Sequence, residues 1–483
     1  MKTNVFFQKA VILITALLIV AGVASGTIGN YTHRSYLAAL ILAVLLFLGL
    51  LVVQKRRWVS FDWLNSMRPG AVCFALSTVC LMINALWVLC FYPAQAADYQ
   101  TYFQTAIDLA NGFHPTGKDY VAMFPHILGY SAFLSIFLRV FGQRILVAAF
   151  VNVVLTVLTG IILYILAFKW TGNKIAAAVV LILWTICPSK LLYNAMTLSE
   201  PYYTFLILVF FLLVTTVFDG EDINTVVVIL HGMVAGVVLA LVNAARPIGV
   251  IPIVAFLIWF LLLTNRKWRE KQGRAGRLFL LTLILCYLCS WKEWNSYAEK
   301  QLEQKLPSVP GYSIYVGFNP ETQGSYADED MDLLQSRYFG EYEGNAQLAQ
   351  QSMLESAKER ILDNKKGIPS LMVHKLRTLL GHDEGGAFYS RESMTEKRYS
   401  FWCVASNIWY YYVCVLSVLG CVSAWKQNRS DSFWMVMLCI IGVILAQLLV
   451  EVAARYHYCL IPMLLLLITP AYRTKGRNID EKV

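Results

Sequence analysis

Residues 70–92 read GAVCFALSTVCLMINALWVLCFY, a stretch that contains no charged side chain. Because a helix rises about 1.5 Å per residue, this stretch is long enough to cross about 30 Å of hydrocarbon. Similar stretches recur along the 483 residues, of which 58% are hydrophobic and only 14% are charged. A soluble protein of this length carries about a quarter charged residues. The sequence therefore predicts an all-α integral membrane protein, and the long apolar runs exclude a β-barrel.

The apolar runs predict twelve membrane-spanning helices. Each run is assigned one span, with boundaries that are accurate to a few residues. The spans are placed at roughly 5–24, 36–53, 70–92, 145–168, 175–195, 202–218, 226–244, 247–264, 278–294, 401–424, 432–450 and 457–472.

The short loops between these runs hold clusters of basic residues. They are Lys55, Arg56, Arg57 and Arg68, then Lys169 and Lys174, then Arg266, Lys267, Arg269, Lys271, Arg274 and Arg277, then Lys426 and Arg429, and finally Arg473, Lys475 and Arg477. With twelve spans and both termini inside, every cluster is cytoplasmic, as the positive-inside rule requires. The net charge of +10 therefore reflects membrane orientation, and no nucleic-acid partner is expected.

This parity requires that the apolar stretch 125–141 does not cross the membrane. We expect an interfacial or re-entrant helix on the outer side, which is permitted only where protein or water satisfies its backbone. A later polar region is expected to contain an amphipathic helix over 345–365 and a second helix after Pro369. The chain then divides into an N-terminal two-helix addition at 1–68, a transmembrane core at 69–294 with an outer loop at 93–144, an extracytoplasmic region at 295–400, and C-terminal transmembrane helices with a cytoplasmic tail at 401–483.

Two carboxylates lie at the expected outer ends of membrane helices. Asp98 follows the third span in Ala97-Asp98-Tyr99, and Glu200 follows the fifth span directly before Pro201. Ionisable groups at the membrane are costly and are functional candidates by default. Asp98 could also act as an N-cap, and Glu200 could mark a helix start, where the helix dipole stabilises a carboxylate.

Cationic groups and a third carboxylate are expected at the same interface. Arg246 precedes Pro247 between two spans, and Glu451, Arg455 and His457 lie between the last two spans. Carboxylates for a base and cations for an anion suit a reaction with a phosphate leaving group. The arginines could instead extend to lipid headgroups, and His457 could be structural.

Several motifs are absent, and their absence limits the function classes. The sequence has no Walker A motif, no HExxH, no paired CxxC motifs and no DxD in the first outer loop. The eleven cysteines lie in or beside apolar runs, where free cysteine packs as a small hydrophobe. We therefore expect no cofactor, and nothing in the sequence supports a divalent metal.

A set of short motifs between about 70 and 472 resembles the GT-C superfamily of polytopic glycosyltransferases, near the protein O-mannosyltransferases and the lipid A aminoarabinose transferases. Each motif is short, and their order and spacing carry the resemblance. They are Asp98-Tyr99 with Tyr102 and Ala106, Gly112, Pro125, Gly129-Tyr130, Phe141-Gly142, Thr197-Leu198-Ser199-Glu200, Gly317-Phe318-Asn319 with Gly324, Asn243-Ala244-Ala245-Arg246-Pro247, and Arg455-Tyr456-His457 with Pro462.

The resemblance implies transfer of a sugar from a polyprenyl-phosphate donor to an envelope glycan, lipid or protein. Asp98 matches the family's catalytic base in an inverting displacement, and Glu200 matches its second acidic position. Arg246 and Arg455 would hold the donor phosphate, because guanidinium groups pair well with phosphate oxygens. The remaining expected binding residues are Tyr99, Tyr102, His126, Lys118 and His457.

The sequence departs from the family at two places. Tyr99 stands where many relatives have a second acidic residue, and Met123-Phe124 replaces a basic residue, for which Lys118 or His126 could substitute. The expected location is a bacterial plasma membrane, with the site facing outward, since nucleotide sugars are cytoplasmic and an outer transferase needs a flipped lipid donor. The alternatives are a ligase or polymerase of lipid-linked oligosaccharides, or a transporter or flippase.

Overall fold

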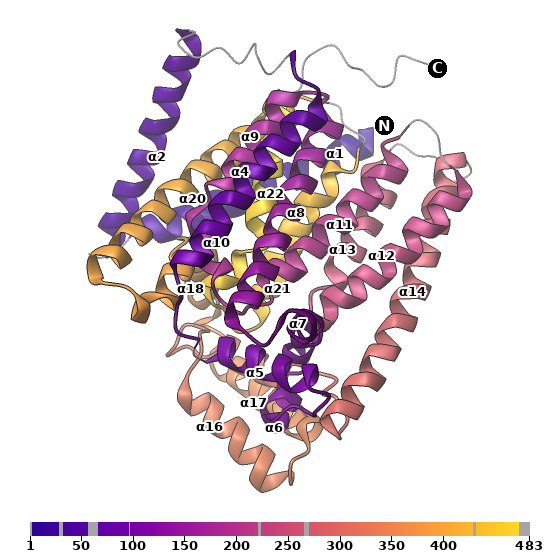
Figure 1. Cartoon of the computed structure of the whole chain (residues 1–483), viewed down its shortest axis with the longest axis vertical. Coiled ribbons are helices and arrows are strands. Elements are labelled where there is room, and N and C mark those ends of the chain that lie inside the picture. The colour runs from indigo at the N-terminus through magenta and orange to yellow at the C-terminus, as the bar shows by residue number, and fades with distance from the viewer. Residues whose placement is uncertain are drawn as a thin grey trace.

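The computed structural model describes residues 2–28, 32–56, 66–95, 97–220, 224–264, 270–427 and 431–472. Within these ranges the regular structure is helical, without a strand. Figure 1 shows long helices that run lengthwise beside one another, with shorter helices such as α5, α6, α16 and α17 gathered at one end. The predicted all-α membrane fold is confirmed.

Among the described residues, eight helices are long and apolar enough to cross a membrane. They carry most of the length of the bundle, and α14 extends well beyond its expected span. They are α1 (Lys2–Thr27), α2 (Thr32–Lys55), α4 (Pro69–Cys90), α8 (Ile145–Thr171), α11 (Glu200–Phe218), α12 (Thr225–Ala245), α14 (Lys271–Leu302) and α20 (Glu396–Trp425).

The other four expected spans are occupied by shorter or broken helices. α9 (Lys174–Thr185) and α10 (Pro188–Asn194) occupy the fifth expected span as a helix pair that is bent by 55°. Pro188 explains this break, because proline disfavours helical conformation in the residue before it. The remaining three are α13 (Val250–Ile258) with the π-helix η1 (Trp259–Leu263), α21 (Phe433–Leu449), and α22 (Leu460–Leu467) with the 3₁₀-helix η5 (Thr469–Tyr472).

The outer loop folds into three short helices, α5 (Asp98–Ala110), α6 (Lys118–Met123) and α7 (His126–Phe141). Figure 1 shows α7 nearly end-on, whereas the long helices run lengthwise. At Gly129, α7 lies so close to α12 that an added Cβ would be 2.2 Å from the carbonyl oxygen of Ala244. This placement across the bundle agrees with the expected interfacial helix.

A region of small helices covers the same end. The two helices expected there are present as α17 (Ala346–Asp363) and α18 (Ile368–Leu380). Around them lie α15 (Gly311–Gly317), α16 (Asp328–Ser336), η2 (Arg337–Glu341), α19 (Gly385–Tyr389), η3 (Arg391–Ser393) and, from the chain between α21 and α22, η4 (Ala454–His457).

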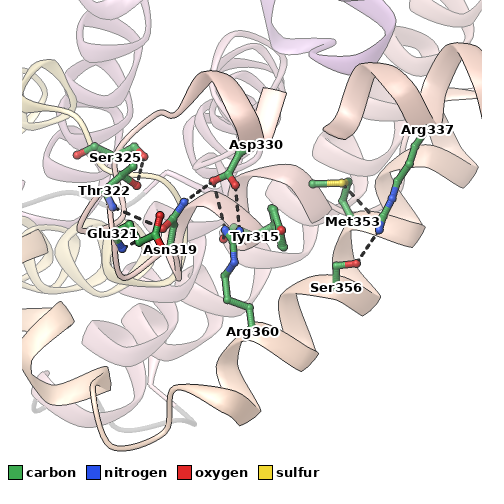
Figure 2. Close-up of polar contacts among 10 residues, drawn as sticks. All are labelled: Tyr315, Asn319, Glu321, Thr322, Ser325, Asp330, Arg337, Met353, Ser356 and Arg360. Atoms are coloured by element: carbon green, nitrogen blue, oxygen red, sulfur yellow. Dashed lines mark hydrogen bonds and ion pairs between the residues drawn. The ribbon is translucent and has the colours of Figure 1, made fainter. Parts of the chain in front are cut away.

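An ion pair between Asp330 and Arg360 joins α16 to α17 in this region (Figure 2). Asp330 of α16 accepts hydrogen bonds from Arg360 of α17 at 3.0 and 3.2 Å and from Asn319 at 2.9 Å. The Arg360 guanidinium also lies 3.4 Å from the centre of the Tyr315 ring. Because both carboxylate oxygens and the guanidinium are satisfied, the pair can be buried without an unpaired charge.

The loops at the opposite end contact one another. Trp170 donates to Asp219, Asn173 to the carbonyl of Tyr472, and Gln427 to the carbonyl of Pro470. Lys169 and Lys174 of the basic loops therefore lie at the end away from the small helices. Several of the expected cytoplasmic residues lie outside the described residues, namely Arg57, Arg266, Lys267, Arg269, Arg429, Arg473, Lys475 and Arg477.

Candidate active site

Asp98 is the first residue of α5 and does not cap it. The N-cap is Ala97, which has a φ of 50° and makes no side-chain cap hydrogen bond. The Asp98 carboxylate forms an ion pair with Arg455 and accepts a hydrogen bond from the Tyr120 hydroxyl at 3.4 Å. Burial alone would raise the pKa of Asp98, but Arg455 outweighs it, so that the pKa lies below its ordinary value.

Arg455 lies between two carboxylates that come from different helices. It belongs to η4, pairs with Asp98, and places its Nε 3.9 Å from Oε1 of Glu200. Its guanidinium is also 5.3 Å from the centre of the Tyr389 ring. The two acidic residues expected from the sequence therefore share one cation, which the fold brings from near the end of the chain.

Glu200 begins α11 and is almost fully buried. Its exposed fraction is 1%, and Pro201 follows it in the first turn, where proline is tolerated. Neither carboxylate oxygen has a hydrogen-bond partner among the described residues. Its position in the first turn favours a carboxylate through the helix dipole, but the dipole does not replace the missing hydrogen bonds.

Arg246 caps the C-terminus of α12 and faces the same site. It is 9% exposed, and its guanidinium lies 4.1 Å from the centre of the Tyr456 ring. Within the described residues this guanidinium has no ion pair and no hydrogen bond. Tyr456 also lies 5.6 Å from the Arg455 guanidinium and donates a hydrogen bond to Glu451 at 3.1 Å. One aromatic ring therefore supports two cations.

Tyr102 and His126 complete the site with groups that carry no positive charge. Tyr102 is buried, and its hydroxyl lies 3.5 Å from Oγ of Ser199, the residue before Glu200. Burial, assisted by Arg246, lowers the pKa of His126 to about 3. His126 is therefore neutral near pH 7, so it can offer a hydrogen bond to a ligand but not the charge that a substituted basic residue would supply.

Two of the expected binding residues do not join the site. His457 is buried, and its Nδ1 donates to the carbonyl of Leu379 at 2.7 Å while its Nε2 lies 2.9 Å from Asp383. Both ring nitrogens therefore have protein partners, which favours the structural alternative. Lys118 pairs with Glu303 at 2.6 Å on the surface, so the structure gives no support to a donor-binding role there.

Three further residues of the site were given no individual role from the sequence. Tyr389 packs edge-on against Tyr99 at 5.7 Å, and no local motif marks it. Tyr456 was part of the motif Arg455-Tyr456-His457, but its contact with both guanidinium groups was not expected. Glu451 was expected at the interface without a role; burial raises its pKa, although Arg455 and Arg246 act in the opposite direction.

The described residues contain no group of three or more His, Cys, Asp or Glu side chains that could hold a metal ion. In the site itself, the cation between the two carboxylates is the Arg455 guanidinium. The chemistry that these residues offer is therefore proton transfer by a carboxylate beside anion binding by two arginines.

Comparison by sequence matches the chain to no family model and to no curated protein. Two solved structures resemble its fold. ArnT from Cupriavidus metallidurans, solved with undecaprenyl phosphate bound, is 12% identical with a TM-score of 0.33, over 83% of this chain and 78% of that one. The oligosaccharyltransferase AglB from Archaeoglobus fulgidus, in complex with an inhibitory peptide and a dolichol-phosphate, is 13% identical with a TM-score of 0.34, over 86% of this chain. The match spans 57% of the AglB chain.

Proposed function

We propose that this protein is an integral membrane glycosyltransferase of the GT-C type. It would take a sugar from a polyprenyl-phosphate donor and transfer it, with inversion, to an envelope glycan, lipid or protein on the outer face of a bacterial plasma membrane. Asp98 is the general base, and Arg246 and Arg455 hold the donor phosphate. The cytoplasmic assignment of the basic loops supports the outward orientation of the site.

The observation that carries this proposal is the unpaired guanidinium of Arg246. Arg246 is buried and forms no ion pair within the described residues, although Glu200 lies within its electrostatic reach, and it shares the Tyr456 ring with a second guanidinium. An anion between the two would remove their repulsion and satisfy the Arg246 donors. Phosphate suits this place because its oxygens match the planar fork of guanidinium groups.

The proposed reaction is a single displacement. The acceptor oxygen attacks the anomeric carbon while its proton passes to a carboxylate oxygen of Asp98. The bond between the anomeric carbon and the phosphate oxygen breaks, and its electron pair leaves with the polyprenyl phosphate. Since Arg455 pairs with Asp98 in this structure, a donor phosphate that binds Arg455 would weaken that pair and make the carboxylate available to the proton.

The test is made in a host that lacks the native gene, with wild type and Asp98→Asn expressed at matched membrane levels. Polyprenyl-linked sugars and envelope glycans are profiled by mass spectrometry. We expect a glycan decoration that Asp98→Asn loses while its lipid-linked donor accumulates, with transfer reduced by roughly 10²–10⁴-fold. Asp328→Asn, the same change on α16 of the outer region, is the control and should transfer normally.

The opposite result would be equally informative. If Asp98→Asn restores everything that wild type restores, Asp98 is not the base and the transfer mechanism is wrong. Movement of a lipid-linked glycan across the bilayer without any new linkage would support the flippase alternative instead, and a longer lipid-linked chain would support a polymerase.

A further inference from the structure

Five polar atoms near Glu200 are buried without a hydrogen-bond partner among the described residues. They are the two carboxylate oxygens of Glu200, the hydroxyl oxygens of Tyr99 and Tyr193, and Nε of Arg455. Leaving one buried polar group unpaired costs on the order of 1–3 kcal/mol, and most buried groups are paired. A concentration of such atoms indicates that another molecule supplies their partners.

One ion-pair distance, two electrostatic interactions and one close approach place these side chains near one another. Nε of Arg455 lies 3.9 Å from Oε1 of Glu200. Tyr99 and Tyr193 each lie within electrostatic reach of Glu200. A Cβ added at Gly385 would lie 2.4 Å from the Tyr193 hydroxyl and 3.3 Å from the backbone nitrogen of Arg455. The four side chains therefore come from α5, α10, α11 and η4 to the same place.

The chemistry of the cluster decides what can bind there. A carboxylate accepts hydrogen bonds, a guanidinium nitrogen donates them, and a tyrosine hydroxyl does both. A phosphate group offers acceptors only when it is fully ionised, so it cannot satisfy Glu200. The required ligand brings several donors and acceptors close together, as the neighbouring hydroxyl groups of a sugar ring do.

We propose that Glu200, Tyr99, Tyr193 and Arg455 bind the sugar ring of the donor, and that Glu200 selects a neutral or amino sugar and rejects a uronic acid. A hydroxyl or ammonium group can donate to the Glu200 oxygens, whereas a sugar carboxylate would face a second carboxylate in a buried site, where like charges repel strongly. This inference rests on the proposed function. In it Glu200 binds substrate, and the base remains Asp98.

The test measures binding to the full-length protein in detergent by native mass spectrometry. The probes share one polyprenyl chain: the unglycosylated lipid phosphate, the same phosphate carrying a neutral hexose or an amino hexose, and the same phosphate carrying a uronic acid. We expect at least one neutral or amino sugar to tighten binding about tenfold or more over the unglycosylated lipid. The uronic acid should give no gain.

Glu200→Gln isolates the selecting group. It should remove most of the gain from the neutral or amino sugar and narrow the gap to the uronic acid, each gain being measured against the unglycosylated lipid phosphate bound by the same variant. The matched control is Thr204→Val, one turn further along α11, where a buried hydroxyl also lacks a partner. This control should behave as wild type with every probe.

Failure of this inference is distinguishable from failure of the proposed function. If the unglycosylated lipid phosphate binds but none of the neutral or amino sugars adds affinity, only solvent fills the cluster and the sugar site is wrong. If a sugar adds affinity and Glu200→Gln leaves the preference over the uronic acid intact, the selecting role of Glu200 is wrong. If the lipid phosphate itself does not bind, the proposed function falls and this inference with it.

Discussion

Arg455 is the residue on which the site depends, because it contacts both acidic groups. It holds Asp98 in an ion pair and reaches toward Glu200 at 3.9 Å. Removing one partner of a buried ion pair is more costly than the pair is worth, since it leaves an uncompensated charge. Substitutions here are therefore best compared with substitutions at Arg246, which forms no ion pair with any described carboxylate.

Arg246→Gln should weaken binding of a polyprenyl phosphate, the carrier of the proposed donor, by about 10–100-fold. The reason is the loss of charge-assisted hydrogen bonds, each worth about 1.5–3 kcal/mol. Titration of the purified protein with this lipid measures the effect. Arg391→Gln, on the exposed surface of the outer region, is the matched control, and equal affinities for the two variants would contradict the phosphate assignment.

The pH dependence of transfer should follow the pKa of Asp98, which Arg455 lowers. Asp98 has a lowered pKa in the folded protein, so it remains ionised as the pH falls below the usual range of aspartate, near 3.9. Its contribution to stability is present above the unfolded value and is lost as the pH falls through the lower folded value.

Arg455→Gln removes the largest influence that lowers this pKa, so the acidic limb of the kcat/KM profile should move to higher pH. The profile is measured with wild type and variant under identical detergent conditions. An acidic limb that stays in place would show that another group, and not Asp98, controls it.

Ala97→Gly should stabilise the protein by about 1 kcal/mol or more. Ala97 has φ 50° and ψ −127°, a conformation that costs an L-residue on the order of 1–3 kcal/mol and that glycine adopts readily. Thermal unfolding in detergent measures the change. Ala94→Gly, three residues earlier and exposed, is the control and should not stabilise.

At the residue scale, the sequence predicted which acidic and basic residues lie near the site better than it predicted which residues they contact. Asp98, Glu200, Arg246 and Arg455 were all expected at one interface and do meet. The pairing of Arg455 with Asp98 could not be read from the sequence, because it depends on how helices far apart in the chain pack. The contact of His457 with Asp383 could not be expected either, because Asp383 lies in a short loop that carries no periodic signal.

At the element scale, the segment between α21 and η4 is held by the outer region. Lys375 of α18 is fully buried and donates to the carbonyls of Gly317, Leu448 and Val450 at 2.9, 2.8 and 2.6 Å. Two of these carbonyls belong to the end of α21, where helix carbonyls lack partners and a cation is favoured. Glu451 and Arg455 follow within a few residues, so Lys375 positions the segment that carries them.

Lys375→Met should destabilise the protein by on the order of 2 kcal/mol and raise KM for the donor, because buried carbonyls lose their partner and Arg455 shifts. Thermal unfolding and donor titrations measure the two effects. Lys375→Arg, which keeps the donors, should recover part of the KM. A variant that loses stability but keeps its KM would show that Lys375 has no positioning role.

The positions of the long helices could be predicted from the lengths of the hydrophobic runs. The breaks within helices and the orientations of helices could be predicted only in part. Pro188 explains the interruption of the fifth span, but the 55° bend depends on packing. The expectation that α7 does not cross the membrane came from the charges of loops along the whole chain. A local sequence pattern could not supply it. The contacts of the small outer helices, such as Asp330 with Arg360, involve no signal stronger than amphipathicity.

At the scale of the whole molecule, the N-terminal helices are fastened to the end that carries the site. Arg377 donates to the carbonyl of Ser25, and Tyr36 donates to Glu384. An added Cβ at Gly26 would lie 2.2 Å from the carbonyl oxygen of Gly381. The expected addition at 1–68 is therefore packed against the segment that leads to Tyr389.

Gly26→Val should destabilise the protein by about 1–3 kcal/mol, since the side chain meets backbone that cannot move aside cheaply. Gly49→Val is the control, because nothing lies within 4 Å of a Cβ there. Thermal unfolding in detergent compares the two. Equal unfolding temperatures would show that the N-terminal helices can separate from α18 without cost.

The Asp98–Arg455 pair, 357 residues apart, also fixes the order in which the protein can mature. At about 5–20 residues per second, the ribosome makes Arg455 roughly 20–70 s after Asp98. During that interval the nascent chain contains Asp98 but not Arg455, so a chain that ends before Arg455 keeps this partly buried carboxylate without its ion-pair partner.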